Sequence, residues 1–263
     1  MGELLVADKS IVVPGEEVAS GMDFLPTEGV YRDGDKLVAS RLGLLAVDGR
    51  LVKLIPLSGK YLPKRGDVIV GKVTDVTISG WRTDINSAYT AMLSMKDATS
   101  EFIARGADLT RYFTFGDYLV TKIVNVTSQN LVDLTMKGPG LRKLSEGRII
   151  TVAPNKVPRI IGKQGSMVSM IKDATGCRII VGQNGVVWLQ GDPDQELVAV
   201  SALRKIESES HISGLTDRIK VFLEGEVKRL HLTPAKNASN DGGSEGEGGR
   251  GEFSEREERE FQQ

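Results

Sequence analysis

The sequence "KVPRIIGKQGSMVSMIKDATGCR", residues 156–178, contains a short loop whose residue types could hold a phosphate chain. Gly162 and Gly165 enclose Lys163 and Gln164, and apolar residues recur on both sides. Since glycine has no Cβ atom, a nucleic-acid backbone can come close to such a loop, and the next helix offers unpaired N–H groups and a positive dipole end. Lys163 adds a charge whose contribution falls as salt rises. The loop is therefore either a clamp for a nucleic-acid backbone or a tight turn between two helices.

A strand and two helices are predicted around this loop. "RIITVAP" reads as a strand, and "NKVPRII" is a candidate for a short helix. In "SMVSMIKDATG" the apolar residues stand at i, i+3, i+4 and i+7, the spacing of one helix face. Gly176 can end that helix in a left-handed cap. The apolar face consists of Met167, Met170, Ile171 and Ala174.

Two further strands and a helix complete this part of the chain. "CRIIVGQ" and "GVVWLQG" meet at Asn184-Gly185, a hairpin signal. Asp192 can cap the last helix, with Pro193 at its first position and Gln195 closing a capping box. The order strand, helix, glycine loop, helix, strand, strand, helix favours a type I KH module, in which a G-x-x-G loop clamps RNA. RNA contact by this particular loop stays open, because a KH module can also serve as a docking surface.

Residues 65–144 read as a unit of short strands. The candidates are "DVIVGKVTDV", "GWRTDIN", "AYTAMLS", "DYLVTKIVNV" and "LVDLTM". In "WRTDIN", Trp81, Thr83 and Ile85 share one face, while Arg82 and its polar neighbours share the other. About five short strands in about eighty residues, with glycines that permit sharp bends, predict a small closed barrel of the OB type.

A barrel of this type binds RNA through exposed basic and aromatic side chains, by phosphate pairing and base stacking. Trp81 could stack on a base, but its position beside Thr83 and Ile85 favours the core. The barrel is poor in aromatic residues, so charge is expected to dominate and binding should depend strongly on salt. The candidate RNA-binding residues of the barrel are Lys72, Arg82, Arg111, Tyr112 and Lys122.

The whole chain is expected to be multidomain, mostly β plus α+β. We predict a β-rich N-terminal domain over 1–63, an S1-type OB barrel over 64–145, a KH domain over 146–233 and a disordered acidic tail over 234–263. In the first domain, Asp48-Gly49 joins two apolar runs in a hairpin. The tail holds eight acidic and four basic residues and is rich in Gly and Ser, so it cannot bury enough surface to fold. By contrast, the segment from Arg148 to Lys172 has five basic residues and no acidic one.

The residues give little support to an enzyme. His211 and His231 stand outside any nucleophile or metal motif, and the carboxylates of the predicted strands are scattered, unlike those of a two-metal nuclease. "GDVIVGKV" fits part of a phosphate-binding loop but ends in Val73, where Ser or Thr is needed to hold magnesium. The single Cys177 allows no intrachain disulfide and no cysteine-based metal cluster. We predict no cofactor and no metal site.

The start of the chain shows no signal region, and charge or glycine interrupts every apolar run well before membrane-spanning length. With one cysteine, the simplest expectation is a reduced, cytoplasmic protein without membrane contact.

Over residues 5–230 the sequence resembles the RNA-binding cap subunit of the archaeal exosome, of the S1-plus-KH type as opposed to the zinc-ribbon type. The resemblance rests on "VVPGE", on "YLPKRGDVIVGKVTDV" leading into "GWRTDINSAYTAML", and on "GQNGVVWLQG". In the last stretch Gly182, Asn184 and Gly185 match the G-x-N-G signature of the family, and an apolar strand with Trp188 follows. The resemblance implies that this signature is structural and packs the KH module against the barrel.

The resemblance also implies a non-catalytic function. Three cap subunits, of one kind or mixed with the zinc-ribbon kind, sit on a hexameric ring of phosphate-dependent exoribonuclease subunits. Their S1 barrels surround the pore and recruit single-stranded, A-rich RNA 3′ ends, while the N-terminal domain and part of the KH module dock. Two alternatives stay open: a free-standing S1–KH regulator of translation or transcription, and a nuclease.

Overall fold

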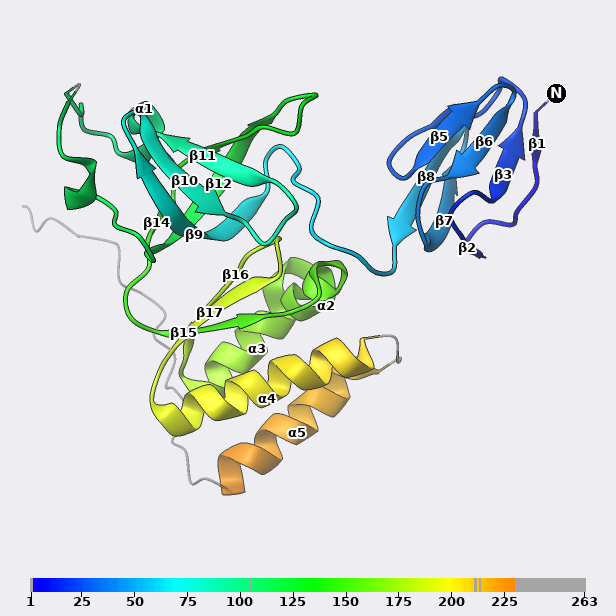
Figure 1. Cartoon of the computed structure of the whole chain (residues 1–263). Helices are drawn as coiled ribbons and strands as arrows, with labels where there is room; N and C mark the ends of the chain where they lie inside the picture. Colours follow the sequence, from blue (N-terminus) through cyan, green and yellow to red (C-terminus); the bar gives the residue numbers. More distant parts are fainter. Residues whose placement is uncertain (1, 105, 211, 213, 230–263) are drawn as a thin grey trace, which may run out of the picture.

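In the computed structural model, a β-rich unit is followed along the chain by a barrel and then by a layer of helices on a small sheet (Figure 1). The structure describes residues 2–104, 106–210, 212 and 214–229. For these residues the predicted fold class, mostly β plus α+β with an OB barrel and a KH module, is confirmed. The acidic tail predicted over 234–263 lies outside the described residues, as do His211 and His231.

Two four-stranded sheets enclose the core of the N-terminal unit. One has the order β1 (Glu3–Leu4), β3 (Glu17–Ser20), β6 (Lys36–Ala39) and β5 (Val30–Asp33). The other has the order β2 (Ile11–Val12), β7 (Gly43–Asp48), β8 (Leu51–Pro56) and β4 (Leu25–Pro26). One buried cluster draws on both sheets, with Leu37 from β6 beside Leu45 and Val52 from the second sheet.

The predicted hairpin between β7 and β8 is present, but its turn lies one residue further along. Asp48 pairs with Leu51, so Gly49 and Arg50 make the turn. Gly49 supplies the left-handed backbone that the turn requires, with φ of 58°.

The barrel contains all five predicted strands. They are β9 (Val68–Thr77), β10 (Gly80–Asp84), β11 (Thr90–Ser94), β12 (Tyr118–Val126) and β13 (Val132–Thr135), and a short β14 (Arg142–Lys143) pairs with β12. The strand order is β13-β11-β10-β9-β12-β14, and an additional pairing of β13 with β12 closes the sheet on itself. The connection from β11 to β12 carries α1 (Met95–Ala98) and a 3₁₀ helix (Leu109–Arg111). The predicted OB-type barrel is therefore confirmed.

Trp81 fills the centre of the barrel and is fully buried, as its alternation with Arg82 predicts. Its Nε1 donates to the carbonyl of Phe113 at 2.9 Å, and the Phe113 ring meets it edge-on. This indole therefore packs the core and is not available for stacking on a base.

Tyr61 joins the same core, and its hydroxyl donates to Asp67 at 2.6 Å. Burial, together with this carboxylate, raises the pKa of Tyr61, so the phenol stays a neutral donor.

The KH module follows the predicted order. It consists of β15 (Arg148–Thr151), a 3₁₀ turn (Pro154–Lys156), α2 (Val157–Ile161), a second 3₁₀ turn (Lys163–Gly165), α3 (Ser166–Thr175), β16 (Arg178–Val181), β17 (Val186–Gln190) and α4 (Pro193–Glu209). Gly176 ends α3 with φ of 71°, and Asp192 and Gln195 form the capping box of α4. Both predicted caps are confirmed.

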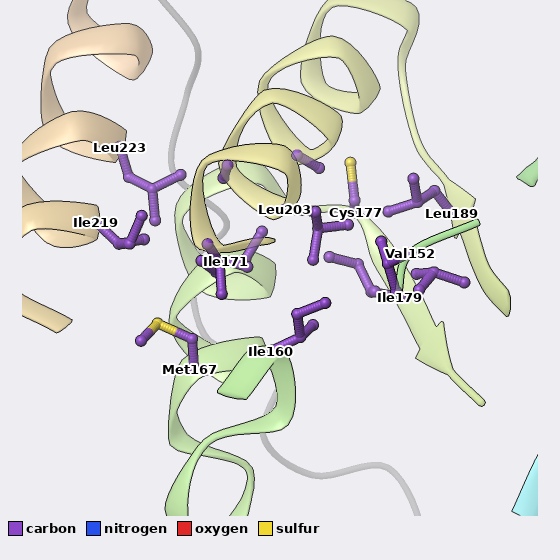
Figure 2. Packing of buried hydrophobic residues seen from close by; sticks show 14 of the residues in the cluster. Val152, Ile160, Met167, Ile171, Cys177, Ile179, Leu189, Leu203, Ile219 and Leu223 are labelled. Atoms are coloured by element: carbon purple, nitrogen blue, oxygen red, sulfur yellow. The ribbon is translucent and has the colours of Figure 1, made fainter. Parts of the chain in front are cut away.

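A further helix, α5 (Leu215–Arg229), was not predicted from the sequence. It packs beside α3 and α4, and Ile219 and Leu223 close the core over Ile171 and Met167 (Figure 2). The sequence does contain a pattern that indicates this helix, because apolar residues recur at helical spacing after Gly214, namely Leu215, Ile219, Phe222 and Leu223.

The sheet β15-β17-β16 is covered on both faces, with helices on one side and the barrel on the other (Figure 1). Alternate residues of β17 face the two layers. Val187 and Leu189 belong to the helical core, whereas Val186 and Trp188 form a smaller cluster with Val70 and other barrel residues. The unbroken apolar run "VVWL" is therefore explained by burial on both faces.

In the described part of the chain, no helix is both long and apolar enough to cross a membrane.

Candidate nucleic-acid interface

Lys72 and Arg82 lie on the outer surface of the barrel, on the adjacent strands β9 and β10. Lys72 is flanked across the sheet by Asp84 on one side and Tyr118 on the other, and its ammonium nitrogen lies 5.8 Å from the centroid of the Tyr118 ring. The guanidinium of Arg82 lies 3.8 Å from the Asp75 carboxylate. Asp75 therefore compensates part of the charge of Arg82, whereas Lys72 has no ion-pair partner among the described residues.

The other barrel candidates are more scattered. Lys122 is exposed on β12, opposite Val68 and Thr135. Arg111 lies in the long β11–β12 connection, where its side chain is 83% exposed and its Nε is 3.6 Å from Asp108. Tyr112 is half-buried, and its ring meets Trp81 edge-on, so it contributes mainly to packing.

Two exposed aromatic residues were not among the sequence candidates. Phe102 and Phe115 are 91% and 74% exposed, and both lie in the β11–β12 connection. Phe115 precedes Gly116, whose N–H donates to Val73 at 2.9 Å, so it stands beside the β9 segment that carries Lys72. Exposed rings and exposed cations on one barrel are the groups that bind single-stranded bases and their phosphates. The sequence signal was a phenylalanine in the turn "TFGD", outside any alternating strand pattern.

Left-handed backbone shapes the glycine loop of the KH module. Gly162, Gln164 and Gly165 have φ of 75°, 54° and 81°. A Cβ atom on Gly162 would stand 2.8 Å from the Cβ and the backbone nitrogen of Met167, whereas one on Gly165 would meet nothing within 4 Å. Gly162 is therefore needed for packing as well as for backbone shape, and Gly165 leaves open space above the loop.

The basic segment around this loop keeps much of its positive charge. Arg148 is paired with Glu196 at 3.1 Å, and the ammonium of Lys156 donates to the neutral hydroxyl of Ser210. Arg159 and Lys163 are exposed, and neither has an ion-pair partner among the described residues. The side chains of Lys163 and Gln164 in the loop are both exposed. No side chain caps the first N–H groups of α3. The arrangement can attract a phosphate.

Asn184 joins the KH module to the barrel through three hydrogen bonds and is fully buried. Its Nδ2 donates to the carbonyls of Val70 at 2.8 Å and Ile85 at 3.0 Å, and its Oδ1 accepts from the N–H of Val70 at 3.3 Å. Asn86 of the barrel donates back to the Asn184 carbonyl at 2.9 Å. The predicted hairpin at Asn184-Gly185 is present, but its loop has four residues, 182–185, and these bond to barrel strands.

The two glycines of the same signature have no room for a side chain. A Cβ atom on Gly182 would stand 2.4 Å from Asn184 Oδ1 and 2.7 Å from the Val70 nitrogen. One on Gly185 would stand 2.3 Å from the Val152 carbonyl, and φ there is 79°. Gly182 and Asn184 therefore serve the contact between the two units, whereas Gly185 packs against Val152 and Pro154 within the KH module.

The site offers binding groups and no reactive cluster. Among the described residues, no three His, Cys, Asp or Glu side chains gather closely enough to hold a metal ion. The single cysteine, Cys177, is buried in the KH core, and burial raises the pKa of its thiol, which keeps it protonated. What the exposed residues can supply is cationic attraction and stacking of bases.

A barrel of the S1 type joined to a KH module defines the class of RNA-binding proteins to which this chain is similar. A family model described as KH domain matches residues 147–205, and one described as the S1 domain of RRP4 matches residues 60–105.

Similar proteins narrow this class to one family. Exosome complex component Rrp4 of Thermococcus kodakarensis is 42% identical over 234 residues, which cover 88% of this chain and 91% of the relative. The Thermofilum pendens protein of the same name is 44% identical over 228 residues, covering 85% and 96%. A crystal structure described as a candidate exosome complex RNA-binding protein is 37% identical with a TM-score of 0.59, covering 66% of this chain and 99% of that one. The chain belongs to the Rrp4 family of exosome complex components.

Proposed function

We propose that this chain is the non-catalytic RNA-binding cap subunit of an archaeal exosome and acts in the cytoplasm. Together with two further caps, of the same or of the zinc-ribbon kind, it sits on a hexameric ring of phosphate-dependent exoribonuclease subunits. It brings single-stranded, A-rich 3′ ends to the pore of that ring. The names of its relatives, which are exosome complex components, support this proposal.

An exposed apolar face on the N-terminal unit is the observation that carries the docking part of the proposal. On the sheet β2-β7-β8-β4, Ile11, Leu44 and Ile55 lie directly opposite one another on three neighbouring strands. Ile11 is 63% exposed and Ile55 is 47% exposed. Leu51 lies on the same face of β8 as Ile55, and Leu25 of β4 is its register partner; both are exposed.

Such a face is expected to be covered in the working protein. The residues that alternate with it, including Val12, Leu45 and Val52, are fully buried in the core, so the strands have apolar side chains on both faces. Lys53 lies on this face between Leu51 and Ile55, so the exposed apolar side chains surround one cation. Exposed apolar patches with polar neighbours mark protein–protein contacts. Because the relatives are exosome components, we assign this face to the ring subunits.

The RNA-binding part rests on the exposed cations Lys72, Arg82 and Lys163 and on the exposed ring of Phe115. They lie on the barrel and on the KH loop, and the contact through Asn184 holds those two units together. An unpaired strand can therefore meet both in sequence. The attraction is mainly electrostatic, so the affinity should fall steeply with added salt.

The test is reconstitution. Purified chain is mixed with the ring subunits, the complex is isolated by size-exclusion chromatography, and degradation of oligo(A) in phosphate and magnesium is compared with that by the ring alone. We expect a stable complex and faster degradation of dilute RNA, with no cleavage by the chain alone. Failure to form a complex would favour a free-standing S1–KH regulator of translation or transcription. Shortening of RNA by the chain alone would favour a nuclease.

A further inference from the structure

A cavity lies where the linker that leaves the N-terminal unit meets the barrel and the KH module. Its volume is about 550 Å³, which is within the usual range for small-molecule sites, and such sites favour the junctions between domains. The linker lines it with residues 57–60, the barrel with Asn86, and the KH module with residues 151–156 and Glu207. Asn155 donates to the carbonyl of Leu57, which fixes the linker as one wall of the cavity.

The charges at this cavity favour an anion. Lys60 and Lys156 both line it, and Lys60 has no hydrogen-bond or ion-pair partner among the described residues. Lys156 is held by the uncharged Ser210, so its own charge is not compensated. The carboxylate of Glu207 is already engaged, since it accepts from the Ala153 N–H at 2.7 Å and from Arg204 at 2.8 Å. The lysines therefore determine the local potential.

The walls between these lysines are apolar or carry amides. Leu57, Val152 and Pro154 supply aliphatic surface, and Asn86 supplies a side-chain amide that is already bonded to the Asn184 carbonyl. Aliphatic surface can cover the flat face of a base, while the two cations can hold the phosphate next to it. The combination is chemically suited to a nucleotide.

The cavity also lies between the two candidate RNA surfaces. Asn86 follows β10 two residues after Asp84, the cross-strand neighbour of Lys72. Lys156 directly precedes α2, the helix that leads into the loop with Lys163. The five-residue helix α2 and Gly162 separate Lys156 from Lys163, so the lysine of the cavity and the lysine of the loop lie at opposite ends of one short helix. A strand running from the KH loop to the barrel would pass this junction.

We propose that this cavity binds one nucleotide of the single-stranded RNA between its contacts with the KH loop and with the barrel. The base lies against Leu57 and Pro154, and Lys60 and Lys156 hold the phosphate. The inference rests on the proposed function, because it assumes that both surfaces bind the same strand. A peptide of a ring subunit is the rival occupant, but two lysines with no free carboxylate favour the polyanion.

The test uses the full chain and an oligo(A) that carries a photoreactive 4-thiouridine. Lys60→Glu should weaken binding about three- to tenfold at low salt and reduce the slope of log affinity against log salt by about one. Ser58→Trp should weaken binding by blocking the cavity without any change of charge. The matched control is Lys220→Glu on the exposed side of α5, which should leave the affinity unchanged. Cross-linked peptides should include residues 57–60 or 151–156.

Equal affinities of Lys60→Glu and Lys220→Glu, or an absence of cross-links to those peptides, would overturn the inference. If Lys163→Glu and Arg82→Glu still weakened binding in that case, the proposed function would stand and only the cavity assignment would fall. If the chain bound no oligo(A) at all, both would fall. A protein–protein cross-linker can also be applied to the complex with the ring. If it linked a ring subunit to residues 57–60, and RNA no longer cross-linked to them, a ring peptide and not a nucleotide would be the occupant of the cavity.

Discussion

Asn184 illustrates how one amide can join two folded units. A primary amide offers two N–H donors and a carbonyl acceptor without carrying a charge, so it can be fully buried if these groups are used. Here the donor meets Val70 and Ile85 carbonyls and the acceptor meets the Val70 N–H. A residue that had only one of these functions would leave a buried backbone group of the barrel without a partner, which costs free energy.

Asn184→Asp is expected to destabilise the protein by about 2–4 kcal/mol, since it places a carboxylate oxygen against two carbonyls and loses two hydrogen bonds. Urea unfolding at pH 7, followed by tryptophan fluorescence, measures the effect because Trp188 lies in the same contact. Gln183→Ala is the control, because only the backbone of Gln183 bonds to the barrel, at 2.9 Å to Val68. A change of less than about 0.5 kcal/mol for Asn184→Asp would contradict this account.

Residue roles that depend on three-dimensional neighbours were the hardest to predict. Tyr112 is a predicted RNA-binding residue, and the sequence does not reveal that its half-buried ring also lies against Trp81. Phe115 was not considered, and it is one of the most exposed rings of the barrel. Both lie in the irregular β11–β12 connection, where no periodicity separates the inside from the outside. In β10, by contrast, the alternation correctly assigned Trp81 to the core.

At the scale of elements, the glycine loop 162–165 must pack against α3, and it is also a candidate for RNA contact. Substitutions have to separate these two functions. Gly162 is packed against the start of α3, so replacing it would disturb the helix as well as any RNA contact. Lys163 is exposed, so its side chain can be replaced without disturbing the core. A change at Lys163 therefore tests RNA contact without testing the fold.

Lys163→Glu is expected to weaken oligo(A) binding about three- to tenfold at low salt, with a smaller effect at high salt because the contact is electrostatic. Fluorescence anisotropy over a salt series measures this, and Lys220→Glu on α5 again serves as the control. The unfolding midpoint should not move. Unchanged affinity at low salt would show that the loop is a turn within a docking surface.

Asp117 links the turn before β12 to the neighbouring strand β14. Burial opposes ionisation of its carboxyl, but the Lys143 ammonium and the Thr114 N–H and hydroxyl outweigh this and hold the pKa below its usual range. A carboxyl whose pKa is lowered by folding stabilises the protein at pH values above its unfolded pKa of about 3.9. That contribution is lost as the pH falls through the folded pKa.

Asp117→Asn should therefore lower the free energy of unfolding by about 1 kcal/mol at pH 7, and the difference from the parent chain should shrink below about pH 4. Urea unfolding at pH 7 and pH 3 measures both values. Asp133→Asn, an exposed carboxylate on β13, is the matched control and should have little effect at either pH. A difference that stayed the same at both pH values would exclude the charge as its cause.

Most elements of the fold could be predicted because their patterns are local. The five barrel strands and the capping box of α4 depend on alternation and on residues three positions apart. Closure of the barrel depends on β12 pairing with β13 as well as with β9, which no local pattern records. The helix α5 was missed although Leu215, Ile219 and Leu223 mark its buried face, because its sequence is charged throughout and follows a complete KH order.

At the scale of the whole molecule, the barrel and the KH module form one unit, while the N-terminal sheets form another. A hydrophobic cluster with Val70, Val120, Val186 and Trp188 lies between barrel and KH module and accompanies the bonds of Asn184. The N-terminal unit has its own core and continues into the linker that Asn155 holds. Binding of RNA and docking on a partner are thus assigned to different units, and single substitutions should separate them.

Ile55→Glu should abolish incorporation into the exosome ring while the free chain keeps its fold and its affinity for oligo(A). Ile55 lies on the exposed face of β8 opposite Leu44, so a carboxylate there would be buried without a partner in the assembled complex. Co-elution with the ring subunits on size-exclusion chromatography measures docking, and anisotropy measures RNA affinity. Val221→Glu makes the same change on α5, where the parent residue is 69% exposed, and should leave docking intact. Normal docking of Ile55→Glu would mean that another surface holds the ring, and equal loss with Val221→Glu would point to a general effect of added negative charge.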